Sequence, residues 1–153
     1  MVGAVVTATA VAGGIATRPN SLWYRSLRKP CWQPPAAAFG PVWTMLYVDI
    51  AFVSALHLAD RLEGFEDDDV KPYAAALAAN LALNASWSWV FFCSRNLPLA
   101  TGVAAALAAS SADLVRRVWK SRTQRGVVLA PYAAWTGFAA ALTAELLRRN
   151  PRR

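Results

Sequence analysis

Five apolar stretches, separated by charged connections, account for nearly the whole chain. They cover residues 2–17, 39–58, 72–92, 97–115 and 126–147. A helix that crosses a bilayer needs roughly 17–25 mostly apolar residues, so each stretch predicts a membrane span, the first one short. The pattern predicts an all-α, polytopic membrane protein: one domain over 1–153, built as a bundle of five transmembrane helices, with no soluble domain beside it.

The first stretch also has the length and the small residues of a signal peptide, but it lacks a basic segment in front of the apolar run. We therefore interpret it as a span. With five spans, the connection 18–38, Arg95 and the C-terminal tail lie on one side of the membrane. Lys and Arg divide almost evenly between the two sides, so the positive-inside rule gives only a slight preference for this side as cytoplasmic.

The connection 18–38 is long, since connections between helices have a median length of about 4–6 residues and longer ones are often functional. It carries three cations, Arg25, Arg28 and Lys29, and several prolines that restrict the backbone. These features favour a shaped lid over one end of the bundle. The alternative is an interfacial belt, because Trp and Tyr gather at membrane surfaces in any case.

The chain has seven tryptophans, and three of them fall on aromatic stripes at helical spacing. At a period of 3.6 residues, three groups each share one helix face: Trp43 with Tyr47, Asn84 with Trp87 and Phe91, and Trp135 with Phe138, Ala139 and Leu142. Such stripes often form ordinary bundle packing, and Asn80 and Asn84 also suit interhelical hydrogen bonds. Together with a basic lid on the same side, they predict a ligand cavity.

The net charge of +7 comes from residues that flank apolar stretches, where they meet lipid headgroups. We therefore expect membrane lipid, and no nucleic acid, as the surrounding partner. We expect Asp113 and Glu145 to pair with arginines one turn further along their helices. The residues leave open whether Cys31 and Cys93 form a disulfide.

The sequence assembles no catalytic triad, no metal-ligand cluster and no glycine-rich phosphate loop, so we expect no metal site and no classical hydrolytic or nucleotide chemistry. His57 is the only histidine, which excludes a haem held by two axial histidines.

The motifs Trp23-Tyr24-x-x-Leu27-x-Lys29-Pro30-x-Trp32 and Gly40-Pro41-Val42-Trp43-Thr44-x-Leu46-Tyr47 resemble those of the TspO/translocator protein family, also called tryptophan-rich sensory proteins. Asn84-x-x-Trp87-x-x-x-Phe91-Phe92 and Pro131-Tyr132-x-x-Trp135-x-x-Phe138-Ala139 continue the resemblance in order. It implies a five-helix membrane protein, commonly a homodimer, that binds porphyrins. Animal members also bind cholesterol and synthetic benzodiazepine-type ligands.

The aromatic stripes and the resemblance to this family together predict which residues form the site. The expected ligand-binding residues are Gly13, Trp32, Phe39, Trp43, Tyr47, Asn84, Trp87, Phe91, Trp135, Phe138, Ala139 and Leu142. Arg25, Arg28 and Lys29 would hold ligand carboxylates. In some bacterial members two indoles are implicated in oxidative breakdown of protoporphyrin, which assigns any catalytic role to Trp43 and Trp135.

The expected function is that of a tetrapyrrole-binding protein of a bacterial cell membrane, with protoporphyrin IX or haem as ligand and no obligatory cofactor. It would act in sensing, trafficking or disposal of porphyrin under oxidative or light stress. The alternatives are light- and oxygen-dependent porphyrin degradation and transport of a small or sterol-like molecule. Thr143 and Trp89 stand where the family usually has asparagine and proline. No Lys or Arg follows Tyr132 closely, so the weak cholesterol-recognition pattern is missing.

Overall fold

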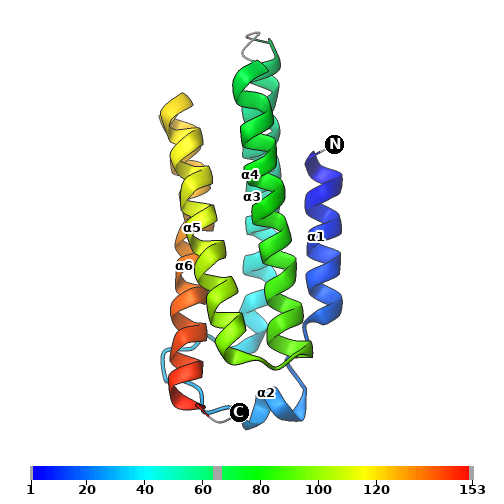
Figure 1. The fold of residues 1–153 in the computed structure, drawn as a ribbon, viewed down its shortest axis with the longest axis vertical. Coiled ribbons are helices and arrows are strands. Elements are labelled where there is room, and N and C mark those ends of the chain that lie inside the picture. The colour runs from blue at the N-terminus through cyan, green and yellow to red at the C-terminus, as the bar shows by residue number, and fades with distance from the viewer. Residues whose placement is uncertain (1, 64–66, 152–153) are drawn as a thin grey trace.

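The computed structural model describes residues 2–63 and 67–151, and within them it contains helices and no strand (Figure 1). The elements are α1 (Val2–Ala16), α2 (Leu22–Ser26), α3 (Ala36–Glu63), α4 (Asp67–Ser88), the π-helical turn η1 (Trp89–Cys93), α5 (Leu97–Ser121) and α6 (Thr123–Arg149). Four of these described segments, α3, α4 with η1, α5 and α6, are long and apolar enough to cross a membrane. The fifth apolar helix, α1, has 15 residues.

The four long helical segments extend beyond the apolar stretches from which they were predicted, because caps and turns rather than hydropathy set their ends. Asn96 caps α5, with its side-chain oxygen accepting from the Leu99 backbone N–H at 3.0 Å. A single residue, Arg122, then separates α5 from α6. The predicted lid region 18–38 contains α2, which Ser21 caps by accepting from the Tyr24 N–H, and the first residues of α3.

The π-helical turn η1 changes which side chains face inward at the end of α4. Its neighbouring residues Phe91 and Phe92 are both buried, with 2% and 9% of their surfaces exposed. Neighbours on an α-helix point about 100° apart, and a π-turn adds one residue to the local repeat. The chain then reverses at Arg95, whose φ of 53° is left-handed, and enters α5.

Large apolar side chains cover the outside of the bundle as well as its core. Met45, Val48 and Phe52 on α3 are 73%, 65% and 61% exposed. An outward apolar surface of this kind fits a helix that faces lipid, where all backbone polar groups are satisfied within the helix.

The long helices run side by side, with α1 beside α4 and α2 crossing the end near the C-terminus (Figure 1). α1 packs against α3 and α4, while α5 and α6 form the most extensive helix pair. One buried apolar cluster, which includes Ile50, Leu114 and Leu129, fills the interior away from α2. A second cluster joins Tyr24 and Leu27 of the α2 region to Phe91 and Leu142. These two clusters position the site.

The tight turn between α5 and α6 requires a glycine at position 126. A Cβ at Gly126 would lie 2.8 Å from the Trp119 Cα atom, which is backbone and cannot rotate away. We expect Gly126→Ala to lower the stability of the detergent-solubilised protein by about 1–3 kcal/mol, the usual cost of overpacking. Thermal unfolding is measured as the fraction of the protein that remains monodisperse after heating.

Gly102→Ala is the matched control, since a Cβ at this position of α5 meets nothing within 4 Å. It should leave the unfolding temperature unchanged or raise it, because alanine is the better helix former. Equal effects of the two variants would show that the α5–α6 approach does not constrain position 126.

Candidate functional site

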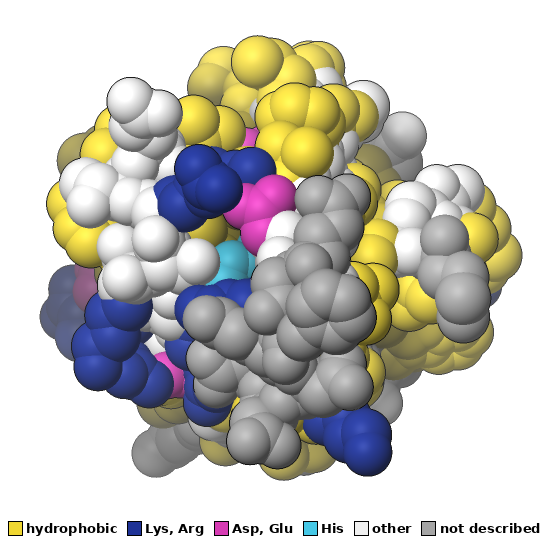
Figure 2. Space-filling model, turned by 90° about the horizontal axis from the view of Figure 1, so that it is seen from above, with side chains coloured by type: hydrophobic (Ala, Val, Ile, Leu, Met, Phe, Trp, Pro, Cys, Tyr) yellow, Lys and Arg dark blue, Asp and Glu magenta, His cyan; other side chains and the backbone are white. Residues whose placement is uncertain are grey.

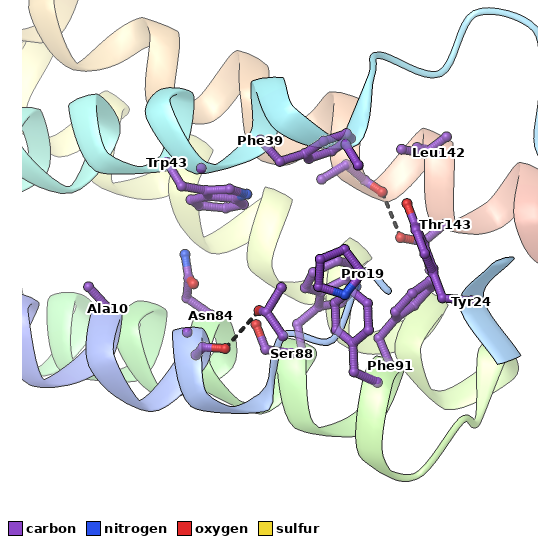
Figure 3. A pocket seen from close by; sticks show the side chains of 18 of the residues that line it. Ala10, Pro19, Tyr24, Phe39, Trp43, Asn84, Ser88, Phe91, Leu142 and Thr143 are labelled. Carbon is purple, nitrogen blue, oxygen red and sulfur yellow. Dashed lines mark hydrogen bonds between the residues drawn. The ribbon is translucent and has the colours of Figure 1, made fainter. Parts of the chain in front are cut away.

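A cavity of about 580 Å³ lies between α1, α3, α4 and α6, next to the connection that carries α2 (Figure 3). Small residues of α1, among them Gly13 and Gly14, form one part of its wall. The aromatic rings in the wall belong to Tyr24, Phe39, Trp43, Tyr47, Trp87, Phe91 and Phe92. Volumes of about 300–1,000 Å³ with an apolar and aromatic lining are typical of small-molecule sites, so this cavity is the candidate site.

The structure brings most of the predicted ligand-binding residues together around this cavity. Those that line it are Gly13, Phe39, Trp43, Tyr47, Asn84, Trp87, Phe91, Ala139 and Leu142. Figure 3 shows Phe39 and Trp43 reaching in from α3, opposite Asn84 on α4. Helical phase therefore places Trp43, Trp87 and Ala139 on faces that turn toward the cavity.

Three predicted residues, Trp32, Trp135 and Phe138, are not part of the cavity wall. They form an aromatic layer behind Phe39, since the Phe39 and Trp135 ring centroids lie 5.8 Å apart and those of Trp135 and Phe138 lie 5.2 Å apart. Trp32 joins this layer through Phe138, at 5.7 Å. Of the two indoles assigned a catalytic role, Trp43 thus lines the cavity, and Trp135 lies outside its wall, in contact with the Phe39 ring.

Tyr24 closes the cavity from the lid side. Its ring packs against Phe91 and Phe92, with centroids 6.1 and 5.5 Å away, and its hydroxyl oxygen accepts from the Gln33 side-chain amide at 3.0 Å. Burial raises the pKa of Tyr24 above its ordinary value, against the opposing effect of the Gln33 hydrogen bond. The phenol is therefore neutral at physiological pH, as a cavity wall requires.

The three cations expected to hold carboxylates lie outside the cavity wall. Arg25 and Arg28 are exposed, and Lys29 is partly buried with its Nζ atom 4.1 Å from the centre of the Tyr24 ring. A cation over an aromatic face is attracted by the ring quadrupole. Lys29 is thus one ring away from the cavity, while the two arginines face outward.

The lid is attached to the C-terminal end of α6 by one side chain, Asn150. Its Oδ1 atom accepts from the Arg28 backbone N–H at 3.0 Å, and its Nδ2 atom donates to the carbonyls of Arg28 at 3.1 Å and Leu146 at 2.9 Å. Asn150 is only 4% exposed. A buried amide in three hydrogen bonds holds the lid backbone in place. Sequence reasoning missed this contact, because nothing in the chain links positions 122 residues apart.

A buried polar layer lies at the inner end of the cavity. The Tyr47 hydroxyl donates to Asn84 Oδ1 at 2.7 Å, and Asn84 Nδ2 donates to the Tyr132 hydroxyl at 3.2 Å. Tyr132 donates in turn to Asn80 Oδ1 at 2.6 Å. Asn84 therefore both lines the cavity and takes part in interhelical bonding, the two interpretations that the sequence left open.

Several wall residues were not predicted. They include Ala10, Thr17, Pro19, Tyr24, Thr44, Ser88, Thr143 and Leu146. Ser88 lies one residue after Trp87, and its Oγ atom would be 3.3 Å from a Cβ at Gly13, so the close approach of α1 to α4 brings it into the wall. Thr143 and Leu146 follow Ala139 by about one and two helical turns, and extending the α6 stripe would have found them.

The opposite end of the bundle holds a smaller hollow of about 140 Å³, lined by His57, Arg61, Tyr73, Arg117 and Lys120. Figure 2 views this end and shows Lys and Arg side chains around the visible histidine. The His57 ring is buried and lies 4.4 Å from that of Tyr73. Among the described side chains, those of residues 2–62 and 70–151, no group of three or more His, Cys, Asp or Glu is placed to hold a metal ion.

Two predicted ion pairs are confirmed. Asp113 pairs with Arg116 and Arg117, and Glu145 pairs with Arg148 and Arg149. Cys31 and Cys93 are both exposed free thiols, so the structure contains no disulfide between them.

A model of the TspO/MBR family matches residues 1–149. The translocator protein of Sus scrofa is 34% identical over 151 residues, a match that covers 90% of this chain and 83% of that protein. The tryptophan-rich sensory protein of Cereibacter sphaeroides is 32% identical over 137 residues, covering 90% and 82%. The tryptophan-rich protein TspO of Archaeoglobus fulgidus is 35% identical over 147 residues, covering 95% and 92%.

The Asn150 contact predicts how firmly the lid is held. Asn150→Ala removes the two hydrogen bonds that this side chain makes to the Arg28 backbone and a third to the Leu146 carbonyl of α6. An unsatisfied buried group costs about 1–3 kcal/mol, and 1.4 kcal/mol is tenfold in a population. We expect trypsin to cleave after Arg25 and Arg28 about tenfold faster in this variant, measured by limited proteolysis of the detergent-solubilised protein.

Asn20→Ala serves as the control, because Asn20 lies in the same connection with its side chain exposed. This variant should be cleaved at the wild-type rate. Cleavage of Asn150→Ala at the wild-type rate would mean that the lid is held by its aromatic contacts alone.

Proposed function

Because the chain belongs to the TspO/MBR family, we propose that it binds a tetrapyrrole, such as protoporphyrin IX or haem, in the cavity beneath the lid. The chain is a multi-pass membrane protein, and its role would be sensing, trafficking or disposal of porphyrin under oxidative or light stress. The observation that carries the proposal is the cavity itself, an aromatic and apolar space below a basic connection.

The shape of the wall supports a large, flat ligand. The Trp87 and Phe91 rings are stacked, with centroids 5.1 Å apart and planes inclined by 22°, and the Trp43 ring faces the space from α3. Aromatic faces contribute both apolar area and stacking to a planar ring system. A macrocycle between these faces would exchange lipid for aromatic contacts on both sides.

The proposed topology counts α1 as the fifth span. At 1.5 Å per residue its 15 residues extend about 22 Å, less than a hydrocarbon core of about 30 Å. A short span is accommodated by local thinning of the bilayer or by flanking polar residues. Its close packing on α3 and α4 supports a place within the bundle.

A homodimer is part of the same proposal, and α4 offers the surface for it. The small residues Ala75, Ala78, Ala79 and Ala82 are exposed on α4, whereas Thr9, Gly13 and Ala16 of α1 are buried inside the bundle. Small residues four apart let helix backbones approach closely. The α4 alanines are therefore free for a second copy of the chain, and the α1 residues serve packing within one copy.

Binding, degradation and transport are separated by two measurements on the purified protein. Protoporphyrin IX absorbance is followed over time with the protein in the dark and under illumination in air. A stable spectrum with quenched tryptophan emission supports binding, and loss of the Soret band that depends on Trp43 supports degradation. Movement of porphyrin across proteoliposomes that contain the protein, beyond that across protein-free vesicles, supports transport.

The wall position Ala139 tests the cavity directly. We expect Ala139→Leu to weaken protoporphyrin IX binding, because the larger side chain fills cavity volume at a cost of about 1–3 kcal/mol, or roughly five- to hundredfold in affinity. Tryptophan quenching titrations give the dissociation constant. The control is Ala141→Leu, since Ala141 is exposed on the same helix and is not part of the wall. If both variants bind as tightly as wild type, the ligand lies elsewhere.

The lid cations test the orientation of the ligand. Replacing Arg25, Arg28 and Lys29 with glutamine should weaken protoporphyrin IX about tenfold, because charge-assisted hydrogen bonds to carboxylates contribute roughly 1.5–3 kcal/mol when sheltered and less when exposed. The dimethyl ester of the same porphyrin lacks the carboxylates and should be nearly unaffected. Equal losses for acid and ester would indicate a membrane-anchoring role for the connection 18–38.

A further inference from the structure

The buried polar layer at the inner end of the cavity has a fixed direction. It runs from Tyr47 on α3 through Asn84 on α4 and Tyr132 on α6 to Asn80 on α4, and ends on Ser110 and Ser111 of α5. Phenol hydroxyls and amides can each take part in such a chain in two senses, since both types of group donate and accept. The sense of the chain decides what Tyr47 offers to a ligand.

The direction is set at Ser111, remote from the cavity. The Ser111 hydroxyl donates to the Leu107 carbonyl at 2.8 Å, so it turns only lone pairs toward Asn80. The Asn80 amide must then present its Nδ2 group to Ser111, at 3.0 Å, and its Oδ1 atom to Tyr132. Each remaining bond follows, because every acceptor in the chain requires a donor opposite it.

At the cavity end of this series of hydrogen bonds, the Tyr47 hydroxyl donates to Asn84 Oδ1. Its single proton is used, so the oxygen of Tyr47, a partly exposed residue of the cavity wall, can accept but not donate a further hydrogen bond. The second amide hydrogen of Asn84 is less accessible, because that residue is 4% exposed. The Trp87 indole nitrogen is buried within the wall itself.

The threonines of the wall have the same polarity, whereas the Ser88 hydroxyl, also in the wall, makes no hydrogen bond within the described residues and can donate as well as accept. Thr17, Thr44 and Thr143 each donate their hydroxyl proton to the carbonyl four residues earlier in the chain, at 2.8, 3.0 and 2.7 Å. Their oxygens also remain acceptors. The lid end differs, since the Tyr24 oxygen accepts from Gln33 and keeps its own proton to donate. Lys29 lies over the Tyr24 ring, outside the cavity wall, and adds positive charge near this end.

We infer that the cavity selects and orients its ligand by hydrogen-bond polarity, with an N–H or O–H donor of the ligand at Tyr47 and its acceptor or anionic groups at the lid. Tyr47 is the residue in contact with the ligand, and Tyr132, Asn80 and Ser111 are positioning residues that act through it. The inference rests on the proposed use of this cavity as a ligand site. It adds the chemical class of the group that binds at the inner end.

A matched pair of probes tests this polarity. Carbazole and dibenzofuran are planar tricycles of nearly equal size that differ only in a ring N–H donor or a ring oxygen acceptor. Their affinities for the detergent-solubilised full chain are measured by equilibrium dialysis with equal detergent on both sides. We expect carbazole to bind about three- to tenfold more tightly, the range that one net hydrogen bond provides.

Tyr47→Phe should abolish this preference, because phenylalanine keeps the ring and removes the acceptor. Tyr73→Phe is the matched control: Tyr73 is also a buried, hydrogen-bonded phenol, paired with Ser54 at 2.9 Å and absent from the wall of this cavity. It should keep the wild-type preference. A preference that survives Tyr47→Phe would overturn the inference.

The positioning residues are tested by the ratio of the two affinities rather than by affinity alone. Tyr132→Phe removes the oxygen that holds the Asn84 amide, so Tyr47 becomes able to donate as well as accept, and the ratio should fall toward one while both probes still bind. A merely structural role would weaken both probes equally and leave the ratio unchanged, which would overturn the relay. If Tyr132→Phe does not fold, Ser111→Ala carries the same expectation, because Ser110 can bond to Asn80 in either sense.

Three further outcomes are decisive. Equal wild-type affinities, tighter binding of dibenzofuran, or no binding of either probe would each overturn the inference. If protoporphyrin IX binds but the probes show no preference, the proposed function stands and the inference fails. If carbazole is preferred but protoporphyrin IX does not bind, the polarity stands and the proposed ligand fails.

Discussion

Three of the long helices, α4, α5 and α6, are joined at one buried amide, that of Asn80. It is fully buried, bonds to α5 through Ser111 and to α6 through Tyr132, and reaches α3 through Asn84 and Tyr47. Apolar side chains gain little by moving from lipid to a protein interior, so in a membrane such directional bonds, together with close packing, determine which helices meet and at what height. The cavity is possible because this layer holds α3, α4 and α6 in register above it.

The interior holds two apolar clusters, and the polar layer is in contact with both the first cluster and the cavity. Ile50 and Leu129 belong to the first cluster, which also includes Tyr132 of the layer, and Phe91 and Leu142 of the second line the cavity. Small residues on α1 complete the wall, since Gly13 brings the α1 backbone close to Ser88 on α4. A space bounded by small residues on α1, by rings on α3 and at the end of α4, and by mostly apolar side chains on α6 is wide and largely apolar.

Much of the fold and part of the site could be predicted from the sequence, and the difference has a physical basis. Helical periodicity assigns Trp43 and Trp87 to inward faces, because the phase of a helix follows from residue spacing alone. Periodicity does not show whether another ring lies between a side chain and the cavity. It therefore could not predict that Trp135 packs against Phe39, outside the cavity wall. Contacts such as that of Asn150 with Arg28 depend on how distant segments meet, which no local pattern encodes.

The π-helical turn at Trp89–Cys93 means that this part of the cavity wall is determined by chain length as well as by residue identity. Such a turn is equivalent to a one-residue insertion into an α-helix, and here it allows the adjacent residues Phe91 and Phe92 to be buried together. A chain that lost one residue from this turn would return to the α-helical repeat without any change in its aromatic content. Gain or loss of a single codon is thus a route by which relatives could vary the width of the site while the surrounding helices keep their register.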